Sequence, residues 1–124
     1  MALERPVIER PEGEPPADLE VTDLAVGDGE EATAGRTVSV HYAGAAFSTG
    51  KEFDASWNRG EEFRFGLGAG QVIAGWDRGV TGMRVGGRRR LVIPAHLAYG
   101  DRGAGGAIAP GETLVFVVDL LGLS

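Results

Sequence analysis

The sequence predicts an α+β domain, in which several antiparallel strands form a sheet that wraps on one short helix. Three observations support this fold class: short segments with period-two alternation recur along the chain, one segment near its middle has apolar residues at helical spacing, and glycine-rich turns separate these segments. With 124 residues, of which 43% are hydrophobic, the chain has the size of one domain and enough apolar residues for one core. We therefore expect a single functional site.

The start of the chain is predicted to lie outside this domain. Residues 1–16 carry four of the six prolines and four glutamates, with few apolar residues. Such a composition is typical of a flexible, extended segment, because it cannot bury enough apolar surface to fold. We therefore divide the chain into an acidic, proline-rich N-terminal arm at 1–16 and a folded domain at 17–124.

The first half of the domain is predicted to be β-structure. A short strand at 21–26, with Val21, Leu24 and Val26, leads into a Gly-Asp-Gly turn. In the segment Thr-Val-Ser-Val-His-Tyr at 37–42, the two valines and the tyrosine fall on one face of a strand and His41 on the other. A turn at 48–51 and a further extended segment at 52–56 complete a predicted hairpin.

One helix is expected near the middle of the chain, after a short strand at 63–65. Its apolar stripe recurs at intervals of three, four and three residues, at Ile73, Trp76, Val80 and Met83. Glycines within the same segment each disfavour a helix by about 1 kcal/mol relative to alanine. The helix therefore needs tertiary packing to be stable.

The last part of the chain predicts two strands, at 88–94 and 113–123, joined by a glycine-rich loop at 99–111. The first of them contains three consecutive arginines at 88–90. Because neighbouring residues of a strand point to opposite faces, we interpret these arginines as a solvated sheet edge that blocks strand addition, and not as a phosphate site.

Composition excludes several functions. The chain has no cysteine, which excludes disulfides, zinc–cysteine sites and thiol catalysis. His41 and His96 have no partners at metal-ligand spacing, so we expect both on the surface and predict no metal. The net charge is −6, yet residues 1–31 hold ten acids against two arginines, which leaves the rest of the chain nearly neutral. Nucleic-acid binding would need a basic face, so it is not expected.

A membrane location is not expected either. The N-terminus lacks an apolar stretch of the length that a secretory signal needs. The longest apolar run, at 114–123, is interrupted by Asp119 and is too short to cross a bilayer. We therefore predict a cytoplasmic protein.

Five spaced segments occur in a fixed order along the chain. They are Val-His-Tyr-Ala-Gly (40–44), Gly-Lys-Glu-Phe-Asp-Ala-Ser (50–56), Gln-Val-Ile-Ala-Gly-Trp (71–76), Ala-Tyr-Gly (98–100) and Leu-Val-Phe (114–116). Together they closely resemble the FKBP family, the tacrolimus-binding immunophilins, over roughly residues 19–123. A chance match to five ordered motifs is much rarer than a match to one short motif.

The resemblance implies a five- or six-stranded antiparallel sheet curled around one short helix, with a hydrophobic pocket between them. It also implies peptidyl-prolyl cis-trans isomerase activity that needs neither cofactor nor metal. The residues expected to act in catalysis are Tyr42, Phe53, Asp54, Trp76, Tyr99 and Phe116. Those expected to bind substrate are Arg59, Phe63, Val72, Ile73 and Ile108.

An aromatic pocket suits this reaction for a physical reason. The X-Pro amide resists rotation by about 18–20 kcal/mol because of its partial double bond. A planar amide is more charge-separated than a twisted one, so a dry cavity disfavours the planar ground state. By family analogy Trp76 forms the floor under the prolyl ring, while the Ile73 N–H and the Tyr99 hydroxyl hold substrate carbonyls. Asp54 is expected to pair with Tyr42 and Arg59, because an unpaired carboxylate is costly in an apolar setting.

Two features leave alternatives open. Ala104 and Gly105 stand where the family usually has histidine and proline near the tip of the 99–111 loop, which affects the expected substrate preference and macrolide binding. Trp57 lies outside the family motifs, in a polar stretch. It either packs against the acidic arm or offers a contact for a partner.

The resemblance also implies the partners. Substrates would be proline-containing peptides and unfolded or partly folded proteins, inhibitors would be macrolides such as tacrolimus and rapamycin, and the chain would be a monomer. Two rival functions remain: a non-catalytic module that binds proline segments or acts as a chaperone, and a carrier of small apolar ligands. Both rivals predict binding without rate enhancement. We rank the carrier last, because it gives the polar residues Asp54, Arg59 and Tyr99 no role.

Overall fold

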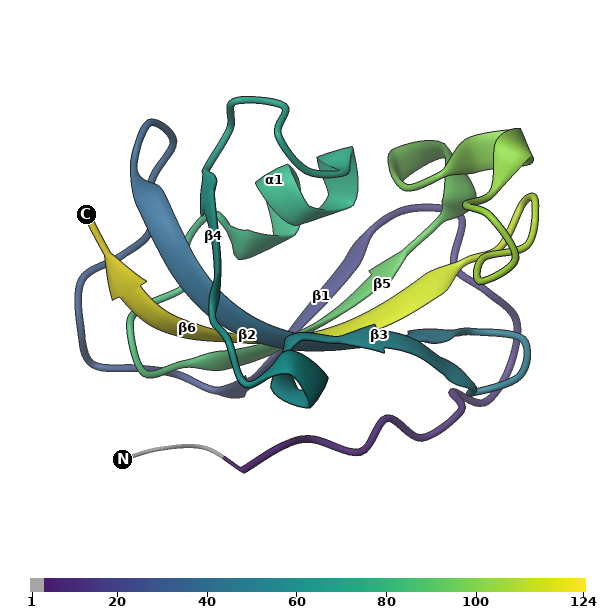
Figure 1. Ribbon diagram of the computed structural model, residues 1–124, viewed down its shortest axis with the longest axis horizontal. Helices are drawn as coiled ribbons and strands as arrows, with labels where there is room; N and C mark the ends of the chain where they lie inside the picture. Colours follow the sequence, from purple (N-terminus) through teal and green to yellow (C-terminus); the bar gives the residue numbers. More distant parts are fainter. Residues whose placement is uncertain (1–3) are drawn as a thin grey trace.

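The structure, a computed structural model, describes residues 4–124 (Figure 1). Within this range six strands form one sheet of order β1-β5-β6-β2-β3, and β4 also pairs with β2. All five pairings are antiparallel. The strands are β1 (Glu20–Ala25), β2 (Thr37–Ala46), β3 (Glu52–Ala55), β4 (Phe63–Gly66), β5 (Arg88–Ile93) and β6 (Leu114–Leu123). The helical elements are α1 (Ala74–Val80) and three short 3-10 helices, η1 (Ser56–Arg59), η2 (Ala95–Leu97) and η3 (Gly100–Arg102). The predicted α+β fold class is confirmed.

Strand β2 organises the half of the sheet that carries the site. Its predicted alternation is confirmed, since Val38, Val40 and Tyr42 are buried in the main core while His41 on the other face is half-buried. One edge of β2 pairs with β6, and the other pairs first with β4 and then with β3. The predicted hairpin is the β2–β3 pair. As a result, β2 brings residues from three other strands to one face.

Helix α1 covers the concave face of the sheet (Figure 1). It is shorter than the predicted stripe: Ile73 precedes its first turn and Met83 follows its end, although Met83 is still buried. A Cβ on Gly79 would lie 2.7 Å from the Leu91 side chain, and one on Gly75 would overlap Ile93. These glycines therefore lower helix propensity, but they also allow α1 to lie directly on β5.

Residues 4–16 run along the opposite, outer face of the sheet (Figure 1). Ile8 packs there against a small cluster of Phe47, Val92 and Val115. The guanidinium of Arg10 donates a hydrogen bond to the Ser48 carbonyl at 2.8 Å. The outer face of β6 is therefore covered by chain, which explains why Leu114–Leu120 is buried on both faces. The flexibility predicted for the arm stays a prediction.

The interpretation of Arg88–Arg90 as a sheet edge is wrong. Strand β5 pairs with β1 on one side and β6 on the other, so it is an interior strand. Arg88 binds the buried carboxylate of Asp119 at 2.6 and 3.0 Å, and Arg89 binds Asp23 at 2.6 Å. The two arginines neutralise acids that lie far away in the sequence, which is why the local pattern did not reveal their role.

Among residues 4–124, no helix has the length and apolar character that a membrane span requires. The cytoplasmic location stays a prediction from the sequence.

Candidate functional site

A cavity of about 200 Å³ lies between the concave face of the sheet and α1. Its walls come from β2, β3, β4 and β6, from the start of α1, and from the loop that follows η2. The lining residues are Tyr42, Phe53, Asp54, Phe63, Gln71, Val72, Ile73, Trp76, Tyr99 and Phe116. Nine of the eleven residues selected from the sequence are in this set, and Arg59 and Ile108 are not. The motifs therefore converge on one place.

The indole of Trp76 is the centre of the aromatic cluster. It is buried, and the rings of Tyr42, Phe63 and Phe116 lie 4.9, 6.0 and 5.3 Å from it, centroid to centroid. These rings are inclined to the indole by 79°, 73° and 87°. Edge-to-face pairs of this kind are favourable. The rings therefore stand as walls around a flat indole, and Phe53 extends one wall through its perpendicular contact with Phe116 at 5.6 Å.

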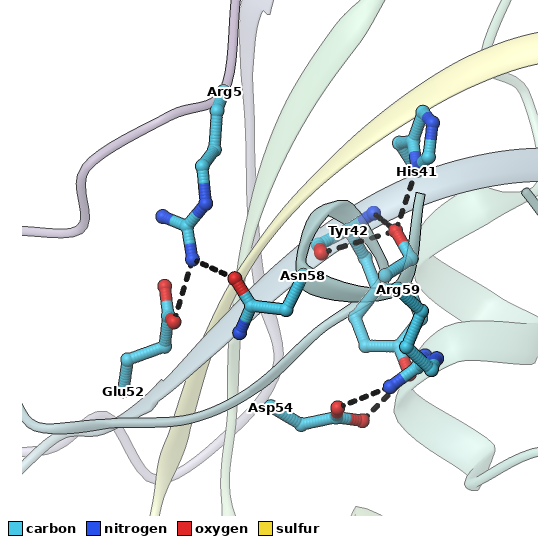
Figure 2. Close-up of polar contacts among 8 residues, drawn as sticks. Arg5, His41, Tyr42, Glu52, Asp54, Asn58 and Arg59 are labelled. Carbon is cyan, nitrogen blue, oxygen red and sulfur yellow. Dashed lines mark hydrogen bonds and ion pairs between the residues drawn. The ribbon is translucent and has the colours of Figure 1, made fainter. Parts of the chain in front are cut away.

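A polar triad closes one side of the cavity (Figure 2). The Tyr42 hydroxyl donates to the Asp54 Oδ2 at 2.6 Å, and Arg59 donates to the Asp54 Oδ1 at 2.8 Å and to the Tyr42 hydroxyl oxygen at 2.9 Å. The predicted pairing of Asp54 with Tyr42 and Arg59 is confirmed. Arg59 does not line the cavity itself, but it binds Asp54 and Tyr42, which do.

The contacts of the triad fix its charges. Burial by itself raises the pKa of the Asp54 carboxyl, but hydrogen bonds from Tyr42 and Arg59 outweigh this effect, so that the pKa lies below its usual value. Burial, followed by the Asp54 carboxylate, raises the pKa of the Tyr42 phenol. Ionised Asp54 therefore stabilises the fold above the pKa of an unfolded aspartate, and this contribution is lost as pH falls through the lowered pKa. At neutral pH Asp54 is charged and Tyr42 is neutral.

A second layer of contacts holds β3 and η1 against β2. The buried hydroxyl of Ser56 accepts a hydrogen bond from the Tyr42 N–H at 2.7 Å and lies 2.8 Å from the His41 Nδ1. The Trp57 ring stacks on His41 at 4.3 Å. His41 is therefore half-buried and not on the surface as predicted, whereas His96 is exposed as predicted. Trp57 packs on the sheet itself, a possibility that the sequence interpretation did not include.

Strand β3 and η1 also contact the N-terminal arm, which runs along the outer face of the sheet. The guanidinium of Arg5 donates to the Glu52 Oε2 at 2.7 Å and to the Asn58 Oδ1 at 2.9 Å (Figure 2). Glu52 and Asn58 flank the stretch that carries Asp54 and precedes Arg59. The N-terminal arm thus contacts the back of the segment that forms the polar wall.

Several hydrogen-bond donors of residues that line the cavity have no acceptor among residues 4–124, and one of them, the indole N–H of Trp76, is buried. Two others are the backbone N–H of Ile73, just before α1, and the hydroxyl of Tyr99, whose side chain is exposed. Both border the cavity, so both are available to a ligand carbonyl. Gln71, which the sequence interpretation missed, also borders it and accepts a hydrogen bond from the Gly66 N–H at 2.8 Å. Its place as the first residue of the Gln-Val-Ile-Ala-Gly-Trp segment is the signal that could have included it.

Ile108 lies outside this cavity. It is 5% exposed, packs in the main core, and borders a neighbouring hollow that also includes Phe53. It belongs to the loop between η3 and β6, where Ala104 and Ile108 form an isolated bridge.

Comparison with protein families matches residues 28–121 to the FKBP-type peptidyl-prolyl cis-trans isomerases. The chain belongs to the FKBP family. It is 70% identical over 122 residues to an FK506-binding protein of Streptomyces anulatus, covering 98% of both chains. It is 50% identical over 119 residues to a probable FK506-binding protein of Corynebacterium glutamicum, covering 96% of this chain and 98% of the relative. As an FKBP-type protein it is a peptidyl-prolyl cis-trans isomerase.

Solved FKBP structures share the fold. The crystal structure of AtFKBP13 matches with a TM-score of 0.80 and 41% identity, over 86% of this chain and 93% of that one. FkpA from Escherichia coli matches with a TM-score of 0.77 and 42% identity, over 86% of this chain and 48% of that one. The resemblance to FKBPs and the predicted sheet around one short helix are therefore confirmed.

A side chain at Gly44, on β2, is expected to disturb the aromatic wall of the cavity. A Cβ at this position would lie 2.6 Å from the Phe116 ring and 2.8 Å from the Phe53 ring. Gly44→Ala must therefore displace both rings, at a cost of about 1–3 kcal/mol in stability. If the cavity holds the substrate, as the family resemblance implies, we expect isomerase kcat/KM to fall by about tenfold or more, because the displaced rings change the shape of the wall. Peptide exchange rates by NMR, together with thermal unfolding, measure both effects.

Gly122→Ala is the matched control, because a Cβ on this β6 glycine would meet no other atom within 4 Å. It should leave activity and stability near the wild-type values. Equal activity of Gly44→Ala and the wild type would contradict the role assigned to the two rings.

Proposed function

We propose that this isomerase accelerates rotation about X-Pro bonds by enclosing the prolyl ring in the aromatic cavity over Trp76. The observation that carries the proposal is the set of three rings that stand nearly perpendicular to the Trp76 indole. Such a cavity excludes water from the amide. Because the planar amide is the more charge-separated form, the loss of water disfavours it relative to the twisted transition state.

The free donors of the site orient the substrate in this proposal. The Ile73 N–H and the Tyr99 hydroxyl bind the carbonyl oxygens on either side of the prolyl ring, so that the ring is held while the preceding amide turns. Each such hydrogen bond contributes about 1 kcal/mol, close to the 1.4 kcal/mol that corresponds to a tenfold change in rate. They act by positioning and need no covalent intermediate.

Asp54 takes a positioning role and not a role in proton transfer. Its pKa is lowered by Tyr42 and Arg59, so at neutral pH it carries no proton to donate. Both carboxylate oxygens are already engaged, one by each partner. The triad therefore presents a fixed dipole to the cavity and keeps the Tyr42 ring in its wall position.

The proposed substrates are proline-containing peptides and unfolded or partly folded proteins. Macrolides such as tacrolimus and rapamycin are the proposed inhibitors, in line with the FK506-binding proteins to which the chain is similar. The cavity is built from residues of one chain. We accordingly propose that the monomer is the active form.

The test is cis-trans exchange of the peptide Ala-Leu-Pro-Phe, followed by NMR line shape with and without rapamycin. We expect acceleration that rapamycin abolishes. Peptide binding without acceleration would instead favour a non-catalytic module that holds proline segments or acts as a chaperone. Binding of small apolar compounds with no effect of the peptide would favour a ligand carrier.

A further inference from the structure

A second hollow, with a volume of about 490 Å³, adjoins the prolyl cavity. One wall is the β2–β3 hairpin, with Thr49, Lys51 and Glu52, and the other is the loop segment 105–110. Phe53 borders both the cavity and the hollow. A substrate polypeptide that leaves the prolyl cavity along the Phe53 ring therefore enters the hollow directly.

The prolyl cavity is too small to hold much more than the prolyl residue. Its volume of about 200 Å³ lies below the roughly 300–1,000 Å³ of typical ligand pockets. A polypeptide substrate must therefore place its flanking residues outside the cavity. The hollow is the adjoining space that can receive them.

The loop wall is open because its side chains are small. Gly105, Gly106 and Ala107 are exposed at its rim, and the larger Ile108 is buried beneath it. Two hydrogen bonds close this turn, from the Ala104 N–H to the Ile108 carbonyl at 2.9 Å and from the Ile108 N–H to the Ala104 carbonyl at 3.2 Å. The wall is therefore a defined turn, which can bind a chain with little loss of its own conformational freedom.

The hairpin wall is polar, and the two carboxylates that border the hollow, one from this hairpin and one from the segment before β6, are already engaged. Glu52 pairs with Arg5 at 2.7 Å, and Glu112 accepts a hydrogen bond from the Ser48 hydroxyl at 2.7 Å. A groove with small apolar side chains on one wall and polar groups on the other suits an extended peptide, which has a polar backbone and alternating side chains. It suits a compact apolar ligand less well.

We propose that this hollow extends the substrate site and binds the polypeptide chain that flanks the proline. The proposal rests on the proposed isomerase mechanism and deepens it. The preferred substrates are accordingly extended segments of unfolded proteins rather than short peptides. Phe53 then has two roles, as a wall of the prolyl cavity and as the junction between the two binding regions.

The experiment compares two substrates with one Leu-Pro core, the tetrapeptide Ala-Leu-Pro-Phe and a decapeptide with three further residues on each side. For the wild type we expect kcat/KM to be about fivefold to tenfold higher on the decapeptide, the effect of one or two added hydrogen bonds. Ala107→Trp should place an indole ring in the hollow, obstruct it and remove this advantage. Its kcat/KM on the tetrapeptide should stay within about twofold of wild type.

Ala17→Trp is the matched control, because Ala17 is also exposed but does not border the hollow. It should keep the full advantage of the longer peptide. In NMR titrations of the wild type, the amides of Gly105 and Gly106 should shift with the decapeptide and not with the tetrapeptide.

The outcomes separate this proposal from the mechanism on which it rests. Equal kcat/KM of the wild type on both peptides, or an equal loss on both in Ala107→Trp, would overturn the extended site and leave the isomerase mechanism in place. Absence of catalysis on either peptide would overturn the mechanism itself.

Discussion

Asp54→Leu should lower isomerase kcat/KM by about tenfold to a hundredfold while the protein stays folded. The substitution removes the hydrogen bonds that Tyr42 and Arg59 donate to the carboxylate, and a tenfold to hundredfold loss corresponds to about 1.4–2.7 kcal/mol of transition-state stabilisation. The Tyr42 ring then loses the contact that holds it in the cavity wall. The effect on stability should be at most about 1 kcal/mol, because the side chains of Asp54 and Arg59 are 40% and 50% exposed.

Peptide exchange by NMR and urea unfolding measure the two effects separately. Asp23→Leu is the matched control, since Asp23 forms an ion pair with Arg89 at 2.6 Å and is 43% exposed, but does not border the cavity. It should leave kcat/KM unchanged. If Asp54→Leu keeps activity within twofold of wild type, the triad has no part in positioning the substrate.

Arg88→Met should destabilise the fold by about 3–5 kcal/mol. Asp119 has no exposed surface, and Arg88 satisfies both of its carboxylate oxygens, at 2.6 and 3.0 Å. Removal of one partner leaves an uncompensated buried charge, which costs far more than an exposed ion pair contributes. Such a loss is a large part of the roughly 5–15 kcal/mol by which domains are stable. Urea denaturation at pH 7 measures it.

Two further variants test the cause of this loss. Arg90→Met removes an exposed arginine of the same strand and should change stability by less than about 0.5 kcal/mol. The double variant Arg88→Met/Asp119→Leu removes both charges and should regain most of the lost stability, because no buried carboxylate remains. A loss in Arg88→Met that the double variant does not reduce would mean that packing, not charge, stabilises this part of the sheet.

The sequence predicts the parts of this fold that depend on local pattern. The alternation in β2 and the apolar run of β6 locate two central strands correctly, because one face or both faces of each are buried. Strand β1 is also located, although its apolar residues Val21 and Leu24 are 44% and 51% exposed. The exposure of these two side chains could not be inferred from the sequence, because it follows from the position of β1 at the edge of the sheet.

Long-range pairing accounts for what the sequence did not reveal. Arg88 and Asp119 are 31 positions apart, and Arg5 and Glu52 are 47 apart, so neither pair leaves a local pattern. The place of β5 inside the sheet depends in the same way on the strand order. Most of the candidate site was predicted because its residues belong to ordered family motifs. Gln71 was missed because it matched no role in them.

Strand β6 has a consequence for how the chain is made. It is the last strand in the sequence, yet it lies in the middle of the sheet, between β5 and β2. During synthesis on the ribosome, β2 and β5 therefore lack their shared neighbour until residues 114–123 have also emerged. Pairing of distant segments slows folding and exposes apolar surface in the meantime. The sheet of the nascent chain is therefore completed only after β6 has been synthesised.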